Sequence, residues 1–180
     1  MRKRLVALVL AGMTLVAISS LSAQARLDIG AIVPRGAGLT LGGGTTDTGA
    51  FIGNWPFIPV PDVGIYYQGD LGLVKLGIGA RAFSLLIETI AVPNAFVELD
   101  LGKVAIEAQV GGGAFLMFGI LPTQANIGNY WIPDLSAWFK IGKKGSFRLG
   151  GGLVGLYLPE VMGNALPFLI YLGGKASLML

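Results

Sequence analysis

The sequence predicts an all-β fold, an eight-stranded antiparallel up-and-down transmembrane β-barrel, and three observations lead to it. Residues 74–82 alternate between apolar side chains such as Val74 and small or charged ones such as Lys75 and Arg81, as in a strand with two unlike faces. The chain is 53% apolar, with a mean hydropathy of +0.71, yet charged residues and prolines interrupt every candidate helical span after residue 25. No amphipathic helix is present to cover an apolar sheet, so we expect the sheet to close with lipid outside and charges inside.

Residues 1–25 have the layout of an export signal. A basic start precedes an apolar stretch at residues 5–18. Ala23 and Ala25 then frame a small-x-small cleavage site. We expect this segment to be removed and residues 26–180 to form one barrel domain. Cleavage after Ala23 is one alternative; retention as an anchor is another, disfavoured because the stretch is shorter than the ~20 residues of a helical span.

The composition excludes several functions. Without the three basic residues of the signal, ten of the 13 Lys and Arg remain against ten Asp and Glu, so the barrel is formally neutral and no nucleic acid is expected as a partner. The absence of Cys excludes disulfides, thiolate chemistry and a lipoprotein anchor. The absence of His removes a common zinc ligand and the usual general base. We therefore expect no enzyme activity, no metal and no cofactor.

Eight strands follow in order from alternation and turn residues. We expect them at residues 26–34, 62–68, 72–83, 91–101, 104–118, 132–142, 146–157 and 166–180. Short turns alternate with longer connections, which in such barrels places the short turns and both termini on the periplasmic side. The connection at residues 84–90 contains no Gly or Pro, so the alternative is that its two strands run longer and meet near Glu88 and Thr89.

Carried through the strands, the alternation puts five cations and five anions on the inner face. They are Lys75, Arg81, Lys140, Arg148 and Lys175 with Asp28, Glu98, Asp100, Glu107 and Asp134. An eight-stranded barrel is only wide enough to be filled by side chains, so we expect these charges to pair into a plug. The residues expected to carry the plug are Lys75, Arg81, Glu98, Glu107, Lys140 and Arg148. An ion or proton pathway is the alternative.

Towards the long-loop end, the inner face is expected to become apolar. A ligand pocket is predicted there, lined by Phe83, Phe96, Phe115, Met117, Trp138 and Leu156. Walls of this kind suit a small hydrophobic molecule. The alternative is that these side chains only fill the barrel.

The signal, the strand count, the unequal connections and the apolar upper lumen resemble small eight-stranded outer-membrane proteins, most of all the OmpW type. That resemblance implies a lumen that passes small hydrophobic molecules sideways into the membrane. The glycine-rich, histidine-free composition also resembles the OmpW-like barrels of spirochaetes. The final strand alternates to its end, as expected for the segment that the outer-membrane assembly machinery recognises, although it ends in Leu180 rather than an aromatic residue.

The sequence thus predicts a barrel of the bacterial outer membrane that binds or conducts small hydrophobic molecules. The alternative is a structural or surface-interaction protein, adhesin-like, with an inert, salt-bridge-plugged lumen, whose loop at residues 35–61 meets partners. An ion-conducting pore is a third reading, disfavoured by the balanced charges. The expected partners are outer-membrane lipid, the assembly machinery and a small hydrophobic ligand, and the oligomeric state stays open.

Overall fold

The computed structural model describes residues 23–36, 40–41, 58–85, 87–142, 145–159 and 166–180. Most of the expected export signal and most of the loop at residues 35–61 lie outside these ranges. Within them, no helix is long and apolar enough to cross a membrane.

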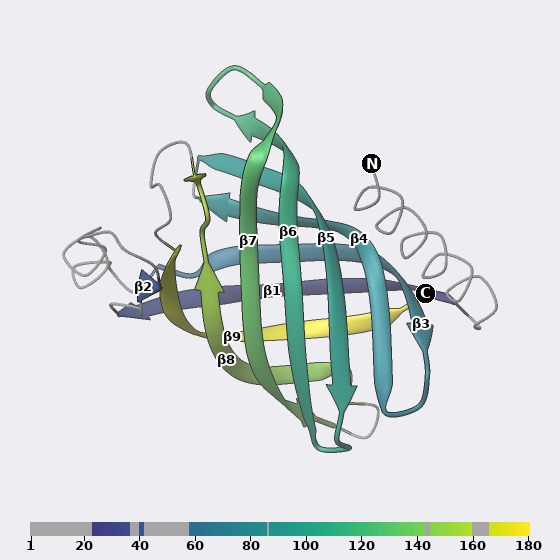
Figure 1. Cartoon of the computed structure of the whole chain (residues 1–180). Coiled ribbons are helices and arrows are strands. Elements are labelled where there is room, and N and C mark those ends of the chain that lie inside the picture. The colour runs from purple at the N-terminus through teal and green to yellow at the C-terminus, as the bar shows by residue number, and fades with distance from the viewer. Residues whose placement is uncertain (1–22, 37–39, 42–57, 86, 143–144, 160–165) are drawn as a thin grey trace, which may run out of the picture.

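Nine strands form one antiparallel sheet in the described part of the chain (Figure 1). They are β1 (Gln24–Gly36), β2 (Thr40–Leu41), β3 (Val60–Asp70), β4 (Val74–Leu85), β5 (Glu88–Asp100), β6 (Val104–Gly119), β7 (Gln124–Ile141), β8 (Phe147–Gly155) and β9 (Leu166–Met179). β2 is only two residues long and pairs with the start of β9, so the other eight strands form the wall. Each strand of the wall pairs with the next in chain order.

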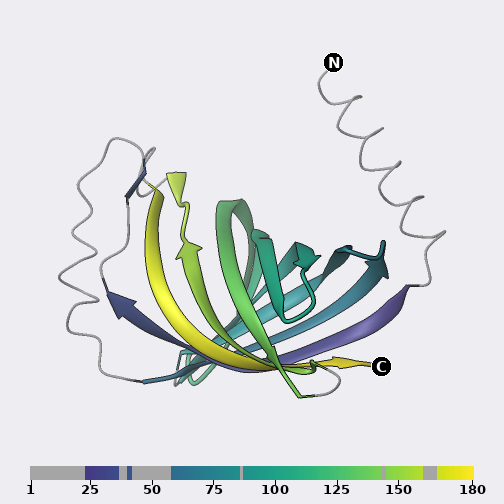
Figure 2. The same ribbon diagram turned by 90° about the horizontal axis from the view of Figure 1, so that it is seen from below.

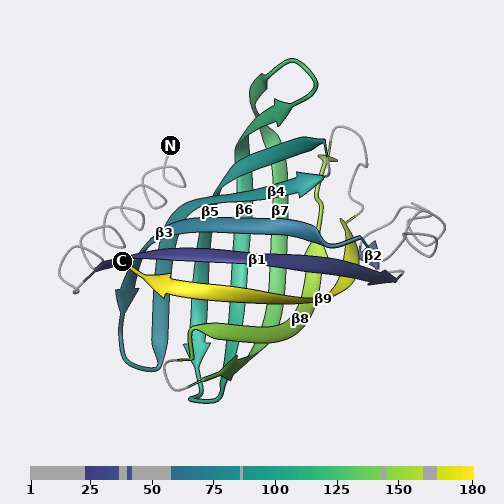
Figure 3. The ribbon, with the colours of Figure 1, turned by 180° about the vertical axis from the view of Figure 1, so that it is seen from behind.

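The sheet closes because its first and last long strands pair. β1 runs antiparallel to β9, from Arg26 opposite Met179 to Gly36 opposite Ile170. Figure 3 shows the two strands side by side, and Figure 2 shows the curl of the sheet. The all-β, eight-stranded antiparallel barrel predicted from the sequence is therefore confirmed.

The wall has two unlike faces, as the alternation requires. In β5, Glu98 has no exposed surface, whereas its neighbours Val97 and Leu99 are 48% and 37% exposed. On other strands, outward side chains such as Ile65 and Leu135 are more than half exposed, at 56% and 53%. A belt of large apolar side chains on the outside is stable against lipid rather than against water.

Two connections between strands are shorter than in the main sequence prediction. β4 and β5 run further and meet with Leu85 opposite Glu88, which was the alternative for that connection. β7 begins at Gln124 rather than at residue 132, so the prediction of a loop over the intervening residues was wrong. This segment pairs with β6, with Gln124 opposite Met117, and the pairing outweighs the weak strand propensity of its Asn and Gly residues.

The first strand begins two residues before the expected end of the signal. Gln24 and Ala25 lie opposite Gln68 and Tyr67 of β3. The position of the cleavage site stays a prediction.

Candidate functional site

The centre of the lumen is occupied by ion pairs around Arg26. Its guanidinium donates hydrogen bonds to Asp28 (2.7 Å), Glu98 (2.7 Å) and Glu107 (2.8 Å). The side chains of Arg26, Glu98 and Glu107 have no exposed surface. A planar guanidinium with five donors suits this position because it reaches carboxylates on several strands at once. Arg26 therefore ties β1 to β5 and β6 across the lumen.

Arg148 and Lys175 bring β8 and β9 into the same group. Arg148 Nη1 donates to Glu98 Oε2 at 2.7 Å. Lys175 Nζ donates to Glu107 and lies 3.2 Å from Asp28 Oδ2. Buried charges are tolerated when they are paired and hydrogen-bonded, and each carboxylate of this group faces at least two cations. In the described residues, no group of three or more His, Cys, Asp or Glu could hold a metal ion.

A second ionic group is centred on Arg81. Its guanidinium forms two hydrogen bonds to Asp62 of β3, at 2.9 and 2.7 Å, and one to Asp134 of β7, at 2.7 Å. Gln109 joins the two groups, because its amide oxygen accepts from Arg81 at 3.4 Å and its amide nitrogen donates to Glu107. The ionic groups therefore form one connected network.

A third group lies near the short turns, at the end of β5. The carboxylate of Asp100 accepts a hydrogen bond from Lys75 at 2.7 Å and pairs with Lys140. Within the described residues, the ion pairs of the lumen thus join six cations to six anions. They are Arg26, Lys75, Arg81, Lys140, Arg148 and Lys175 with Asp28, Asp62, Glu98, Asp100, Glu107 and Asp134. The six residues predicted to carry the plug all belong to this set.

The sequence prediction of the network omits Arg26 and Asp62. Each is the first residue of a predicted strand, where no preceding residue fixes which face it takes. Arg26 nevertheless shares its parity with Asp28, and Asp62 shares its parity with Gln68. Alternation carried to the strand ends therefore identifies both.

Three of the residues predicted to line a pocket pack on cations of the lumen. Phe83 lies with its ring 4.5 Å from the guanidinium carbon of Arg81. Phe96 lies with its ring 4.6 Å from the guanidinium carbon of Arg26. Trp138 lies with its ring 4.7 Å from Lys175 Nζ. The expectation that the rings of Phe96 and Trp138 lie above the charges was therefore wrong, although Trp138 also belongs to the buried apolar cluster with Ile32, Val60, Ala105 and Tyr171. Trp138 is near the short-turn end of β7, and an aromatic face attracts a buried cation.

Several of the predicted pocket residues also have apolar neighbours. Phe83 packs against the buried apolar cluster that contains Trp138. Phe115 packs edge to face on Tyr130, with ring centroids 5.5 Å apart. Met117 lies further along β6, and Leu156 is 38% exposed. Phe83 and Trp138 thus share one apolar cluster, and a pocket lined by all six residues stays a prediction.

Two glycines, Gly64 and Gly77, leave room for aromatic rings in the lumen because they have no side chain. A Cβ atom on Gly77 would clash with the ring of Phe96, and one on Gly64 would clash with the ring of Tyr66. The two rings themselves pack edge to face, with centroids 5.0 Å apart. In a lumen this narrow, the missing side chains are what let the rings fit.

A second feature stands at the other end of β6 and β7, which extend as an arm (residues 113–130). Figure 1 shows the end of this hairpin above the neighbouring strands. The arm contains no charged residue. Large apolar side chains are exposed on it, namely Leu116 (43%), Phe118 (41%), Ile120 (77%), Leu121 (50%) and Ile127 (85%).

The arm is a paired and anchored part of the wall. It starts where the register between β6 and β7 shifts between Gly112 and Ala114. Gly112 (φ 133°) and Gly113 (φ 75°) adopt backbone conformations that favour glycine, as at many bulges. Near the tip, the backbone N–H of Leu121 donates to Glu88 Oε1 at 2.6 Å, which fastens the arm to the start of β5.

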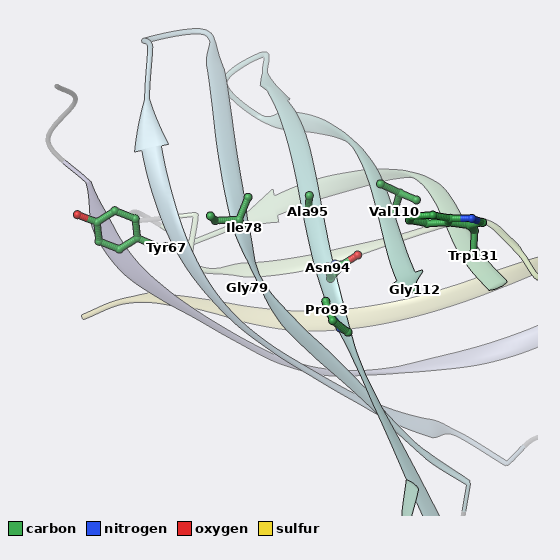
Figure 4. A pocket seen from close by; sticks show the side chains of 9 residues that line it. All are labelled: Tyr67, Ile78, Gly79, Pro93, Asn94, Ala95, Val110, Gly112 and Trp131. Atoms are coloured by element: carbon green, nitrogen blue, oxygen red, sulfur yellow. The ribbon is translucent and has the colours of Figure 1, made fainter. Parts of the chain in front are cut away.

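The outer wall carries a hollow of about 610 Å³ that spans β3 to β7 (Figure 4). Tyr67 and Trp131 stand at its two ends, and the small residues Gly79, Ala95 and Gly112 leave space between them. Tyr67 and Trp131 are 51% and 43% exposed on the outside of the barrel. The hollow therefore opens within the apolar belt and is separate from the pocket predicted inside the lumen.

Three solved structures have a similar form. Neisserial surface protein A is similar over 86% of this chain and 96% of its own, with 9% identity and a TM-score of 0.41. The N-terminal β-barrel domain of Pseudomonas aeruginosa OprF matches over 87% and 100%, with 11% identity and a TM-score of 0.40. The Yersinia pestis outer membrane protein Ail matches over 87% and 100%, with 10% identity and a TM-score of 0.42. Likeness this low carries no argument about function.

No family model and no curated protein matches the chain. The OmpW type is therefore not established as its family. What the chain itself presents is a closed eight-stranded barrel with an apolar outside, a lumen filled by paired charges, and an uncharged arm.

Proposed function

We propose that the protein is a barrel of the bacterial outer membrane with an inert, sealed lumen, and that it acts as a structural and surface-interaction protein through its arm. The observation that carries the proposal is the ionic network in the lumen. Arg26, Glu98 and Glu107 meet there with no exposed side-chain surface. A barrel of eight strands has no width to spare beyond such a filling, so solutes have no path along its axis.

The apolar belt supports the placement in a membrane. Outward side chains on β3, β7 and other strands are half exposed and aliphatic or aromatic, which would be a severe aggregation hazard in water. In an outer-membrane barrel, the short turns face the periplasm. The arm then stands on the extracellular side, since β6 and β7 reach it from their ends away from the short turns.

The arm supports a role in contacts at the cell surface. It exposes large apolar side chains and carries no charge over residues 113–130. Exposed apolar patches that are continuous and uncharged are typical of protein interaction sites. The partner that fits such a surface is a protein with an apolar patch of its own, rather than an acidic or basic ligand.

Conduction of small hydrophobic molecules has less support. Phe83, Phe96 and Trp138 each pack on a cation of the lumen. The OmpW-type resemblance remains a reason to test uptake of apolar probes, but the sealed network favours the surface role.

Adherence of cells that express the chain tests this function. Bacteria carrying the protein are compared with bacteria lacking it on epithelial monolayers and on immobilised matrix proteins. In the arm variant, Phe118→Ser with Ile127→Ser, adherence should fall to the level of cells without the chain. The control, Thr123→Ser with Gln124→Ser, changes exposed polar residues of the same hairpin and should adhere normally.

The competing contact site is the loop at residues 35–61. Deletion of residues 42–57 should leave adherence intact if the arm is the contact surface. Loss of adherence in the loop deletion alone, or no adherence of the unaltered chain above background, would contradict the proposal.

A further inference from the structure

Three hairpins of the barrel place like charges directly opposite each other on the inner face. One sets Lys140 of β7 opposite Arg148 of β8, and the other two face each other across the lumen. Glu98 of β5 lies opposite Glu107 of β6. Arg148 of β8 lies opposite Lys175 of β9. Like charges in opposed positions destabilise an antiparallel pair, so each hairpin by itself carries an unfavourable contact.

We call β5 and β6, with Glu98 opposite Glu107, the anionic hairpin, and β8 and β9, with Arg148 opposite Lys175, the cationic hairpin. The neighbouring strand β4 offsets only part of the repulsion in the anionic hairpin. Lys75 Nζ lies 3.6 Å from Glu98 Oε1 but 2.7 Å from Asp100 Oδ2. The close partner of Lys75 is therefore Asp100, and the repulsion between Glu98 and Glu107 has to be relieved from elsewhere.

The two hairpins relieve each other across the lumen. Arg148 donates to Glu98 at 2.7 Å, and Lys175 donates to Glu107. These partners are 50 and 68 residues apart in the sequence, and β7 lies between the two hairpins in the wall. The contacts therefore form only when the sheet has curled and the cationic hairpin faces the anionic one.

Closure of the barrel also brings a fifth charged side chain, Arg26, next to Glu98 and Glu107. Arg26 belongs to β1, the strand that pairs with β9, and its guanidinium reaches both Glu98 (2.7 Å) and Glu107 (2.8 Å). The pairing of β1 with β9 thus sets Arg26 beside Lys175, with Glu107 between them.

The pairing of β1 with β9 needs a register signal more than any other junction of the wall. It joins the first strand to the last, so no turn sets its register (Figure 3). Its ladder is also rich in glycine, with Gly173 opposite Ile32 and Gly174 opposite Ala31. Register is weakly specified where side chains are missing from a strand.

We propose that the opposed like charges act as a register lock for barrel closure. A slip of β9 by two residues along β1 keeps every side chain on its own face. It moves Lys175 away from Gly30 and puts Gly173 or Ser177 in its place, so the Lys175–Asp28 pair across this junction is lost and Arg26 is displaced from the Lys175–Glu107 pair beside it. Only the native register lets Arg26 and Lys175 share both Asp28 and Glu107, so the charges select it.

Cysteine cross-linking of the full chain in the membranes of a Gram-negative host tests the lock, and the natural chain has no Cys to interfere. Ile29 lies opposite Ala176 in the native register, so a cysteine pair at these positions reports correct closure. Pairs that join Ile29 to Gly174 or to Leu178 report slips of two residues in either direction. Disulfides need Cα atoms within about 7 Å, which favours directly opposed positions.

The lock variant removes the four opposed charges in balance, as Glu98→Gln, Glu107→Gln, Arg148→Met and Lys175→Met. We expect the yield of slipped cross-links relative to the native one to rise about tenfold over the unaltered chain, the factor that two opposed pairs of ordinary strength amount to. The control removes the other buried group, as Asp62→Asn, Arg81→Met and Asp134→Asn, which contains no opposed like charges. It should keep the native cross-link pattern.

Two results would overturn the lock. One is a lock variant that cross-links only in the native register, and the other is an equal rise of slipped products in the control. If the fourfold variant does not reach the heat-resistant folded form in gels, the pair Glu107→Gln with Lys175→Gln is judged by the same cross-links. A purely native pattern in that milder variant also overturns the proposal.

Discussion

The lumen and the arm differ in the chemistry of their side chains, which are charged in the lumen and apolar in the arm. The lumen holds six cations and six anions within a few ångströms of one another, most of them buried. The arm has no charge and exposes five large apolar side chains. A barrel in lipid reverses the usual arrangement of a soluble protein, so charge closes the interior and apolar groups are left for contacts. This difference is the basis of our proposal that the first region stabilises the barrel and the second acts in recognition.

The largest effect should come from removing the hub of the lumen. Arg26→Met leaves Asp28, Glu98 and Glu107 without their shared cation, and breaking a buried ion pair in this way costs about 3–5 kcal/mol of the free energy of unfolding. Urea unfolding of the reconstituted barrel, followed by tryptophan fluorescence, measures the loss. Lys103→Met, on an exposed turn, is the control and should change stability by less than ~0.5 kcal/mol.

If Arg26→Met unfolds at the same urea concentration as the unaltered chain, the claim that the lumen stabilises the barrel and the arm does not is contradicted. The lumen would then be only a filling, and its charges would not hold the barrel together.

A smaller effect is expected from Gly77→Leu. The new side chain would occupy the position of the Phe96 ring, which has Arg26 on its face and Tyr66 at its edge. Overpacking of this kind costs about 1–3 kcal/mol. The same urea titration detects it, and Ala108→Leu on the exposed outer face is the matched control. Equal midpoints for Gly77→Leu and the unaltered chain would show that the lumen has spare room.

The smallest effect on stability is expected in the arm. Phe118→Ser with Ile127→Ser removes exposed apolar surface and leaves the barrel ladder intact, so the free energy of unfolding should change by less than about 1 kcal/mol. A loss as large as that of Arg26→Met would mean that the arm is part of the folding core instead of a surface for contacts.

The lumen could be predicted from the sequence to a large extent because two strong physical rules act there. Side chains alternate strictly in a strand, and a charge is costly on a lipid face, so Lys75, Glu98 and Glu107 could be placed inward. Pairwise partners across the lumen, such as Arg148 with Glu98, depend on how the sheet curls. No pattern within one strand contains that information.

The arm could not be predicted in the same way. Gln124 and the residues after it have little strand propensity of their own, and β6 holds them in place by pairing. The bulge at Gly112 and Gly113 sets the course of the arm, and three successive glycines do not reveal which of them will take a positive φ. The height of Trp138 along the barrel, beside the charged side chains, could not be predicted because its contact with Lys175 comes from a strand far along the chain.

Ionic conductance in planar lipid bilayers tests the sealed lumen most directly. On our proposal that the network centred on Arg26 seals the lumen, the unaltered barrel should show no steady conductance. A well-inserted barrel that gives steady, ohmic current steps would contradict the sealed lumen and with it the assignment of recognition to the arm.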